Sequence, residues 1–129
     1  MADRIDSFKD LLVYKKAIKL QQAIFELTKR FPKEEQYSLT DQIRRASRSI
    51  GANITEAWQK RRYVAHFVSK LTDANGEQAE TEHWLDTSFL CKYVLDNEHE
   101  SLVKECKEIG KMLGKIMAEP EKWCRSFDK

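Results

Sequence analysis

The 129-residue sequence has few residues that break helices and no long apolar run. Only four glycines and two prolines are present, too few for the many tight turns of a β-sandwich or a β-barrel. No stretch approaches the roughly 18 apolar residues that a membrane-spanning helix needs. With 34% charged and 41% apolar residues, the composition predicts one soluble, all-α domain covering residues 1–129.

Cysteine is also scarce. The three cysteines, Cys91, Cys106 and Cys124, are odd in number and lack the spacing of metal ligands. The chain does not begin with the charged and then apolar segments of a secretion signal. We therefore expect a cytoplasmic protein with reduced thiols and no membrane contact.

A large excess of one charge is likewise missing. Lysine and arginine number 23 against 21 aspartates and glutamates, which gives a formal net charge of +2. So small a net charge provides little long-range attraction toward a polyanion. A role in nucleic-acid binding would depend on where the cations lie.

Four stretches repeat apolar residues at alternating spacings of four and three, which is typical of helices with one buried face. We predict helices over residues 8–31, 38–59, 64–94 and 98–118, followed by a tail over residues 119–129. Ser7, Ser38 and Asn97 are the expected N-caps, and Pro32 and Pro120 end the first and last helices. The short connections leave no length for a crossover, so we expect an antiparallel up-down-up-down four-helix bundle.

Polar residues interrupt two of the predicted buried lines. The line on the third helix consists of Phe67, Leu71, Ala74, Gln78, Thr81, Leu85 and Ser88. Asn53 and Glu56 lie on or beside the line of the second helix. Buried polar groups must be hydrogen-bonded, so we expect these residues to fix helix register or subunit pairing. Gly76 should relieve crowding or mark a kink, because glycine costs about 1 kcal/mol relative to alanine inside a helix.

Cations concentrate on the second predicted helix and at its end. From Asp41 to Arg62 there are six cations and two acids, and the candidate nucleic-acid-binding residues are Arg44, Arg45, Arg48, Lys60, Arg61 and Arg62. Arg44 and Arg48 share a face because they are one helical turn apart, and phosphate attraction grows with the number of cationic contacts. Arg44 or Arg45 could equally form ion pairs with acids of the third helix, such as Glu77 or Glu80. The two roles do not exclude each other.

The aromatic residues Trp58 and Tyr63 flank the run Lys60-Arg61-Arg62. We expect both rings to be partly exposed. An exposed ring beside cations could stack on a base of a single strand.

We predict neither a catalytic site nor a metal or cofactor site. Glu80 and His83 form one Glu-x-x-His pair, but a di-iron site in a bundle needs two such pairs and carboxylates from the other helices. His66 and His99 have no glutamate three residues earlier. No cysteine lies beside a histidine that could act as its base, so we expect a protein that is not an enzyme.

Several motifs together resemble a known family. They are Phe31-Pro32 with Glu35, the run from Tyr37 to Ala46, Ser49-Ile50, Ala52-Asn53-Ile54-Thr55-Glu56, and Leu71-Thr72-Asp73-Ala74 with Glu77, Glu80 and Leu85. They resemble the bacterial four helix bundle protein family, also described as the ribosomal RNA intervening-sequence protein or S23 family. The chain departs from the family pattern at Ala57-Trp58, where many members have a glycine. It also departs at Arg62–Phe67, where the usual serine or threonine cap is missing.

The resemblance implies a fold, an assembly and a set of partners. It implies a bundle that assembles as a homopentamer and has no enzymatic activity. It also implies a relation to the accessory protein of diversity-generating retroelements, which binds nucleic acid and a reverse transcriptase. The expected partners are further copies of the chain, RNA or DNA, and a protein such as a reverse transcriptase. The alternative function is a scaffold for protein–protein interaction without nucleic-acid binding.

Overall fold

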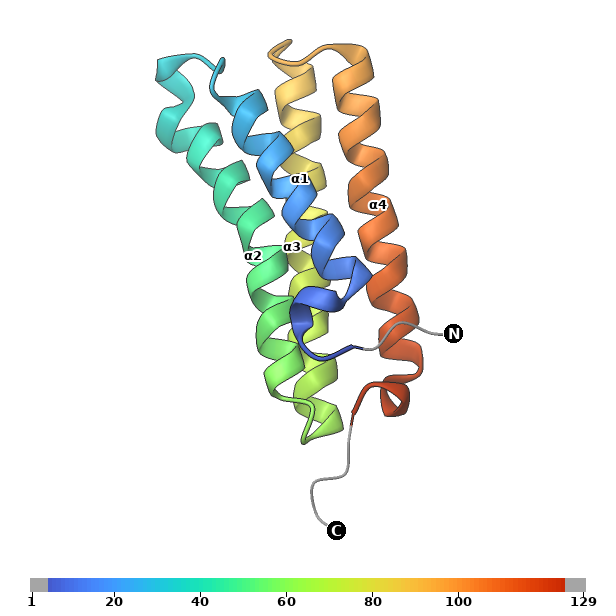
Figure 1. The fold of residues 1–129 in the computed structure, drawn as a ribbon. Coiled ribbons are helices and arrows are strands. Elements are labelled where there is room, and N and C mark those ends of the chain that lie inside the picture. Colours follow the sequence, from blue (N-terminus) through green and yellow to red (C-terminus); the bar gives the residue numbers. More distant parts are fainter. Residues whose placement is uncertain (1–4, 125–129) are drawn as a thin grey trace.

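The computed structural model describes residues 5–124, which form four long helices packed side by side (Figure 1). The helices are α1 (Leu12–Thr28), α2 (Asp41–Gln59), α3 (Val64–Leu90) and α4 (Asp96–Ala118). Each helix runs antiparallel to the next, and α1 also packs against α4, which closes the bundle. The predicted all-α, up-down-up-down architecture is confirmed. None of the helices in this part of the chain combines the length and apolar character that crossing a bilayer requires.

The core lies where the four apolar stripes meet. On α3 the whole predicted line is buried, including its polar members, from Phe67 to Ser88. Ile50 of α2, Leu85 of α3 and Ile109 of α4 are each completely buried. Full burial of one such side chain contributes about 1.5–3 kcal/mol, so the stripes account for most of the stability of the bundle.

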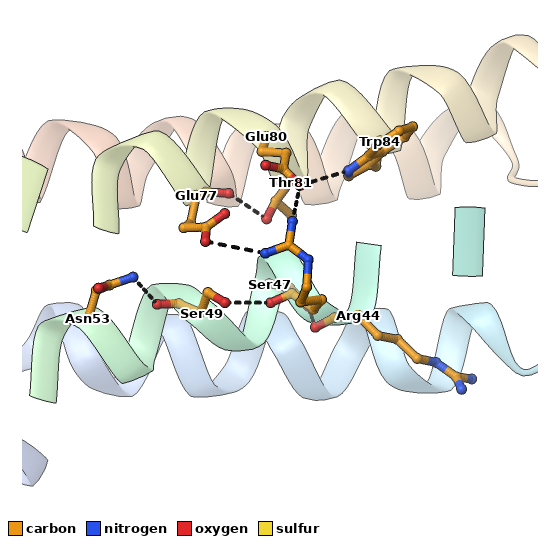
Figure 2. Close-up of polar contacts among 9 residues, drawn as sticks. Arg44, Ser47, Ser49, Asn53, Glu77, Glu80, Thr81 and Trp84 are labelled. Carbon is orange, nitrogen blue, oxygen red and sulfur yellow. Dashed lines mark hydrogen bonds and ion pairs between the residues drawn. The ribbon is translucent and has the colours of Figure 1, made fainter. Parts of the chain in front are cut away.

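Two of the polar residues in or beside the core bond within their own helices (Figure 2). The Thr81 hydroxyl donates to the Glu77 carbonyl at 2.8 Å, and the Asn53 amide donates to the Ser49 carbonyl at 2.9 Å. These two bonds do not join helices, so they do not fix helix register, and a role in subunit pairing stays a prediction. Glu56 does join two helices, through an ion pair of 2.8 Å with Lys70 of α3, but it does so at the surface.

The first helix has a different start from the predicted one. Ser7 acts as an N-cap as predicted, but of a 3-10 helix, Phe8–Asp10, and Asp10 completes a capping box with it. Leu11 then adopts an extended backbone with ψ 129°, so α1 itself begins only at Leu12. The helix also ends at Thr28, three residues before the predicted end.

Two predicted N-caps are wrong. Ser38 lies inside a π-helical turn, Gln36–Thr40, whose backbone continues directly into α2. The Gln36 carbonyl of this preceding turn accepts the backbone N–H of Asp41, so the start of α2 needs no side-chain cap. At α4 the carboxylate of Glu98 accepts the backbone N–H of Leu95 at 2.8 Å, which places the cap two residues before Asn97.

The ends of α3 follow from its flanking residues. The helix begins at Val64 without a side-chain cap, as the missing serine or threonine suggested. It ends at Leu90, four residues before the predicted end, and Lys92 adopts a left-handed φ of 65° in the turn that follows. Gly76 in the interior has no atom within 4 Å of the position of an added Cβ, so it does not relieve crowding.

The turn between α1 and α2 and the turn between α3 and α4 lie at the same end of the bundle (Figure 1). The Tyr93 hydroxyl donates to a carboxylate oxygen of Glu35 at 2.7 Å. The rings of Phe31 and Tyr93 lie 5.6 Å apart, and Arg30 forms an ion pair with Glu98. These contacts join the two turns. The hydrogen bond to Glu35 and partial burial raise the pKa of Tyr93 to about 12.

The tail begins with a 3-10 helix, Pro120–Lys122, because Pro120 cannot continue α4. Trp123 follows and is partly buried against the core. Phe127, another aromatic residue of the tail, lies outside the described residues.

Candidate nucleic-acid interface

The six candidate residues lie along α2 and in the turn that follows it, but their side chains take different directions. Successive residues of a helix are about 100° apart around its axis. Arg44 and Arg48 are therefore on the side of α2 that borders α1, whereas Arg45 is on the side that borders α3. Lys60, Arg61 and Arg62 lie in the turn to α3.

Three cations gather around the ring of Phe25 on α1. The guanidinium carbons of Arg44 and Arg48 lie 4.9 Å and 5.5 Å from the ring centroid, and the ammonium nitrogen of Lys29 lies 4.8 Å from it. We call Phe25, Lys29, Arg44 and Arg48 the Phe25 cluster. Cations are attracted to the face of an aromatic ring, which contributes about 0.5–1 kcal/mol at an exposed site.

The Phe25 cluster is held in place by α1 but is poorly neutralised. Arg44 Nε donates to the hydroxyl of Thr28 at 2.8 Å, and this hydroxyl in turn donates to the Ile24 carbonyl. Glu26 reaches Lys29 at 3.2 Å. Within residues 5–124, no carboxylate forms an ion pair with Arg44 or Arg48. The cluster therefore presents an excess of positive charge to solvent.

Arg45, the third arginine of the predicted site, is engaged by α3. Its guanidinium lies 2.6 Å from a carboxylate oxygen of Glu80 and 3.6 Å from one of Glu77. The same Glu80 oxygen accepts the indole N–H of Trp84 at 3.1 Å. Figure 2 shows both glutamates facing α2, while the side chain of Arg44 is directed away from them. The alternative prediction, ion pairing with acids of the third helix, is thus confirmed for Arg45.

The second basic run surrounds two aromatic rings of unequal exposure. Arg61 Nε donates to the Trp58 carbonyl at 2.8 Å, and its guanidinium carbon lies 3.5 Å from the Trp58 ring centroid. Trp58 is only 7% exposed, so the expectation of a partly exposed ring is wrong for this residue. Tyr63 is 54% exposed, as predicted, and Arg62 lies 5.9 Å from its ring centroid.

The surface of α2 between the two basic regions carries no exposed acid that faces outward. Ala52 and Gln59 are exposed and uncharged there. Glu56 turns toward α3, where the Lys70 ammonium lowers its pKa. At 1.5 Å per residue, Arg44 and Lys60 are roughly 24 Å apart along the helix. The two basic regions thus form the ends of one path along α2.

Part of this site could not be found in the sequence. Lys29 and Phe25 are four residues apart on α1, which places them on one face, but nothing local indicates that this face meets Arg44 and Arg48. The only signal is that Phe25 lies beside the buried stripe of α1 and widens it toward a neighbouring helix.

The Glu80–His83 pair and Cys106 are engaged by neighbouring side chains or buried. Glu80 is bonded to Arg45 and Trp84, and His83 packs edge-on against the Trp84 ring. In the described part of the chain, no three His, Cys, Asp or Glu side chains gather as metal ligands do. Cys106 is completely buried, and burial together with nearby acids raises the pKa of its thiol to about 12. Cys106 is therefore protonated and inaccessible at neutral pH.

The fold and the site define an antiparallel four-helix bundle protein whose chief surface feature is a cationic face. Residues 9–115 match the family described as 23S rRNA-intervening sequence protein, and the chain belongs to this family. A similar solved structure is the crystal structure, at 1.70 Å resolution, of a protein of unknown function from the S23 ribosomal protein family of Bacteroides thetaiotaomicron VPI-5482. It is 33% identical, with a TM-score of 0.75, over 83% of this chain and 96% of that chain.

The family resemblance predicted from the motifs is thus confirmed. No curated protein matches the chain. Neither the family's description nor that of the crystal structure names a catalytic activity. The relation to the retroelement accessory protein and the pentameric assembly stay predictions.

Proposed function

We propose that this protein binds nucleic acid through phosphate contacts along the outer face of α2, without strong sequence preference. The observation that carries the proposal is the Phe25 cluster, in which three cations surround one ring and one acid reaches them. Like charges gathered around one ring repel each other. Phosphate groups would relieve this repulsion and release bound counterions, which favours binding.

The second basic region and the family support the same role. Lys60, Arg61 and Arg62 continue the cationic path beyond the end of α2. The family's description names 23S rRNA, and the similar crystal structure is assigned to a ribosomal protein family. We therefore choose RNA as the first ligand to be tested.

The test is a titration of labelled RNA and single-stranded DNA of equal length with the purified protein at 50 mM salt. Replacing Arg44 and Arg48 by glutamine removes the two unneutralised charges and retains part of each side-chain stem. At this salt concentration we expect affinity to fall about tenfold or more. Circular dichroism of the variant shows that the fold is retained.

A matched control removes two cations elsewhere. Lys104 and Lys111 are exposed on α4, and changing both to glutamine alters the net charge equally. This variant should bind as the unchanged protein does. Equal losses in both double variants would show that only total charge matters and would contradict the proposed site. Absence of binding at 50 mM salt would remove the proposed function and leave the protein-scaffold alternative.

A second role, self-association, is favoured by exposed apolar side chains at one end of the bundle. Tyr37 and Leu95 lie in the two joined turns, Leu90 is the last residue of α3 beside them, and all three are exposed, Leu90 by 79%. Exposed apolar patches mark interaction surfaces. We expect a solution mass that is a multiple of 15.2 kDa, and five copies is the number that the family resemblance implies. Changing Leu90 and Leu95 to serine should lower the mass measured by light scattering. The control, Val64→Ser at the other end of the bundle, should leave the mass unchanged.

A further inference from the structure

The turn between α2 and α3 exposes an aromatic ring that the core does not use. Tyr63 lies outside the buried cluster, and its side chain does not cap α3. The rings of Tyr63 and His66 lie 5.2 Å apart at an interplanar angle of 60°, and His66 is exposed as well. Large aromatic side chains contribute strongly to binding when buried at an interface. We call Lys60, Arg62, Tyr63 and His66 the Tyr63 cluster.

The charge around this ring is positive. Lys60 is exposed, and the guanidinium carbon of Arg62 lies 5.9 Å from the Tyr63 ring centroid. Glu56, the acid of α2 that is nearest to Lys60 in the sequence, forms an ion pair with Lys70 of α3. An accessible π-face among cations complements a ligand that carries both a flat ring and an anionic group.

We propose that the Tyr63 cluster binds an unpaired nucleotide of single-stranded RNA. The base would stack on the exposed ring of Tyr63, and the adjoining phosphates would contact Lys60 and Arg62. The inference rests on the proposed function, because it places this nucleotide on the same strand that contacts the Phe25 cluster, roughly 24 Å away along α2. It adds a preference that phosphate contacts alone do not give.

The preference is for single strands over duplexes. In a duplex both faces of each internal base are covered by neighbouring bases, so none is available to Tyr63. Stacking of one base on an aromatic side chain strengthens binding by about fivefold or more and depends little on which base it is. Phosphate contacts at the Phe25 cluster, by contrast, are available in single strands and duplexes alike.

The experiment measures the affinity of the full chain for a labelled single-stranded RNA and for an RNA duplex of the same length. Tyr63→Leu should weaken binding of the single strand about fivefold or more and leave binding of the duplex unchanged. Tyr63→Phe keeps the ring and should bind as the unchanged protein does. The control is Leu12→Ala, which removes an exposed apolar side chain that belongs to neither cationic cluster and should have no effect.

A second ligand tests stacking directly. An RNA of the same length with abasic sites offers phosphates without bases, and both the unchanged protein and Tyr63→Leu should bind it with the weaker affinity. If Tyr63→Leu leaves single-strand binding unchanged, or weakens single-strand and duplex binding equally, the inference is wrong. If that happens while Arg44→Gln with Arg48→Gln still weakens binding, the proposed function survives. If the unchanged protein binds no RNA at low salt, both fail.

Discussion

Arg44 and Arg45 are neighbours in the sequence but have different environments. Arg44 donates to Thr28 of α1 and lies over Phe25, whereas Arg45 lies between Glu77 and Glu80 of α3. The rotation of about 100° between consecutive helical residues separates them. At the scale of single residues, only Arg44 keeps its charge available to a ligand, and Arg45 is part of the contact between α2 and α3.

Arg45→Ala should therefore change stability more than binding. Its ion pairs are partly exposed, and such pairs contribute at most about 1 kcal/mol. We expect a decrease of this size or less in the free energy of unfolding, measured by urea titration, with RNA affinity within about twofold of the unchanged protein. A loss of affinity as large as that expected for Arg44→Gln with Arg48→Gln would place Arg45 in the interface.

Tyr93 gives a prediction about pH. Its hydrogen bond to Glu35 requires the protonated phenol, and the pKa is raised from 10 to about 12. A raised pKa means that the folded state holds this proton more tightly than the unfolded state does. The stabilisation is therefore complete below pH 10 and disappears as the pH rises through 12.

The check compares the unchanged protein with Tyr93→Phe in urea unfolding at several pH values. The variant should be less stable near neutral pH, and the difference should vanish between pH 10 and 12. A difference that does not depend on pH would mean that packing of the ring against Phe31, and not the hydrogen bond, is what Tyr93 contributes.

At the scale of elements, α3 and α4 approach closely at one glycine. A Cβ added at Gly110 would lie 2.8 Å from Oε1 of the buried Gln78, whereas one added at Gly76 or Gly114 would meet no atom within 4 Å. Gln78 thus packs against the backbone of α4. The contact of Gln78 with α4 supports the expectation that this polar residue fixes helix register.

The three glycines should respond differently to replacement by alanine. Gly76→Ala and Gly114→Ala should each stabilise the protein by about 1 kcal/mol, because alanine is the better helix former. Gly110→Ala should lose this gain, since Gln78 must move to make room. Urea unfolding measures the free energy of unfolding of each variant. A Gly110→Ala protein as stable as the other two would contradict the close contact between Gly110 and Gln78.

The elements themselves could be predicted better than their ends. The buried line of α3 follows from spacing alone, since every third or fourth residue returns to the same face. The start of α2 could not be predicted, because the chain is already helical before Ser38 and makes its capping signal unnecessary. The end of α3 depends on the left-handed backbone of Lys92, a residue type that rarely adopts it.

The site could be predicted only in part for a related reason. The six cations of α2 and its turn are visible in the sequence, but their division between ligand-accessible and paired residues depends on which helix lies beside each one. Arg45 pairs with acids of α3 that lie more than thirty positions away in the sequence, whereas Arg44 contacts Thr28 and Phe25 of α1. Trp58 packs in the core four residues after the buried Ile54, a helical spacing that the expectation of an exposed ring overlooked.

At the scale of the whole molecule, the two proposed surfaces are separate. The α1–α2 and α3–α4 turns, beside which Tyr37, Leu90 and Leu95 are exposed, lie at one end of the bundle (Figure 1), and the cationic path follows the length of α2 away from that end. Copies joined at the apolar end would leave each α2 face accessible. An assembly would then repeat the path around its axis and increase the number of phosphate contacts.

The salt dependence of RNA binding tests the central claim, that unneutralised cations of α2 contact phosphates. For a single strand, each contact contributes about 0.7 to the slope of log affinity against log salt concentration. The unchanged protein should give a steep negative slope, and Arg44→Gln with Arg48→Gln should reduce its magnitude by about 1.4 per chain engaged. Equal slopes for the two proteins, or an affinity that does not depend on salt, would contradict the account.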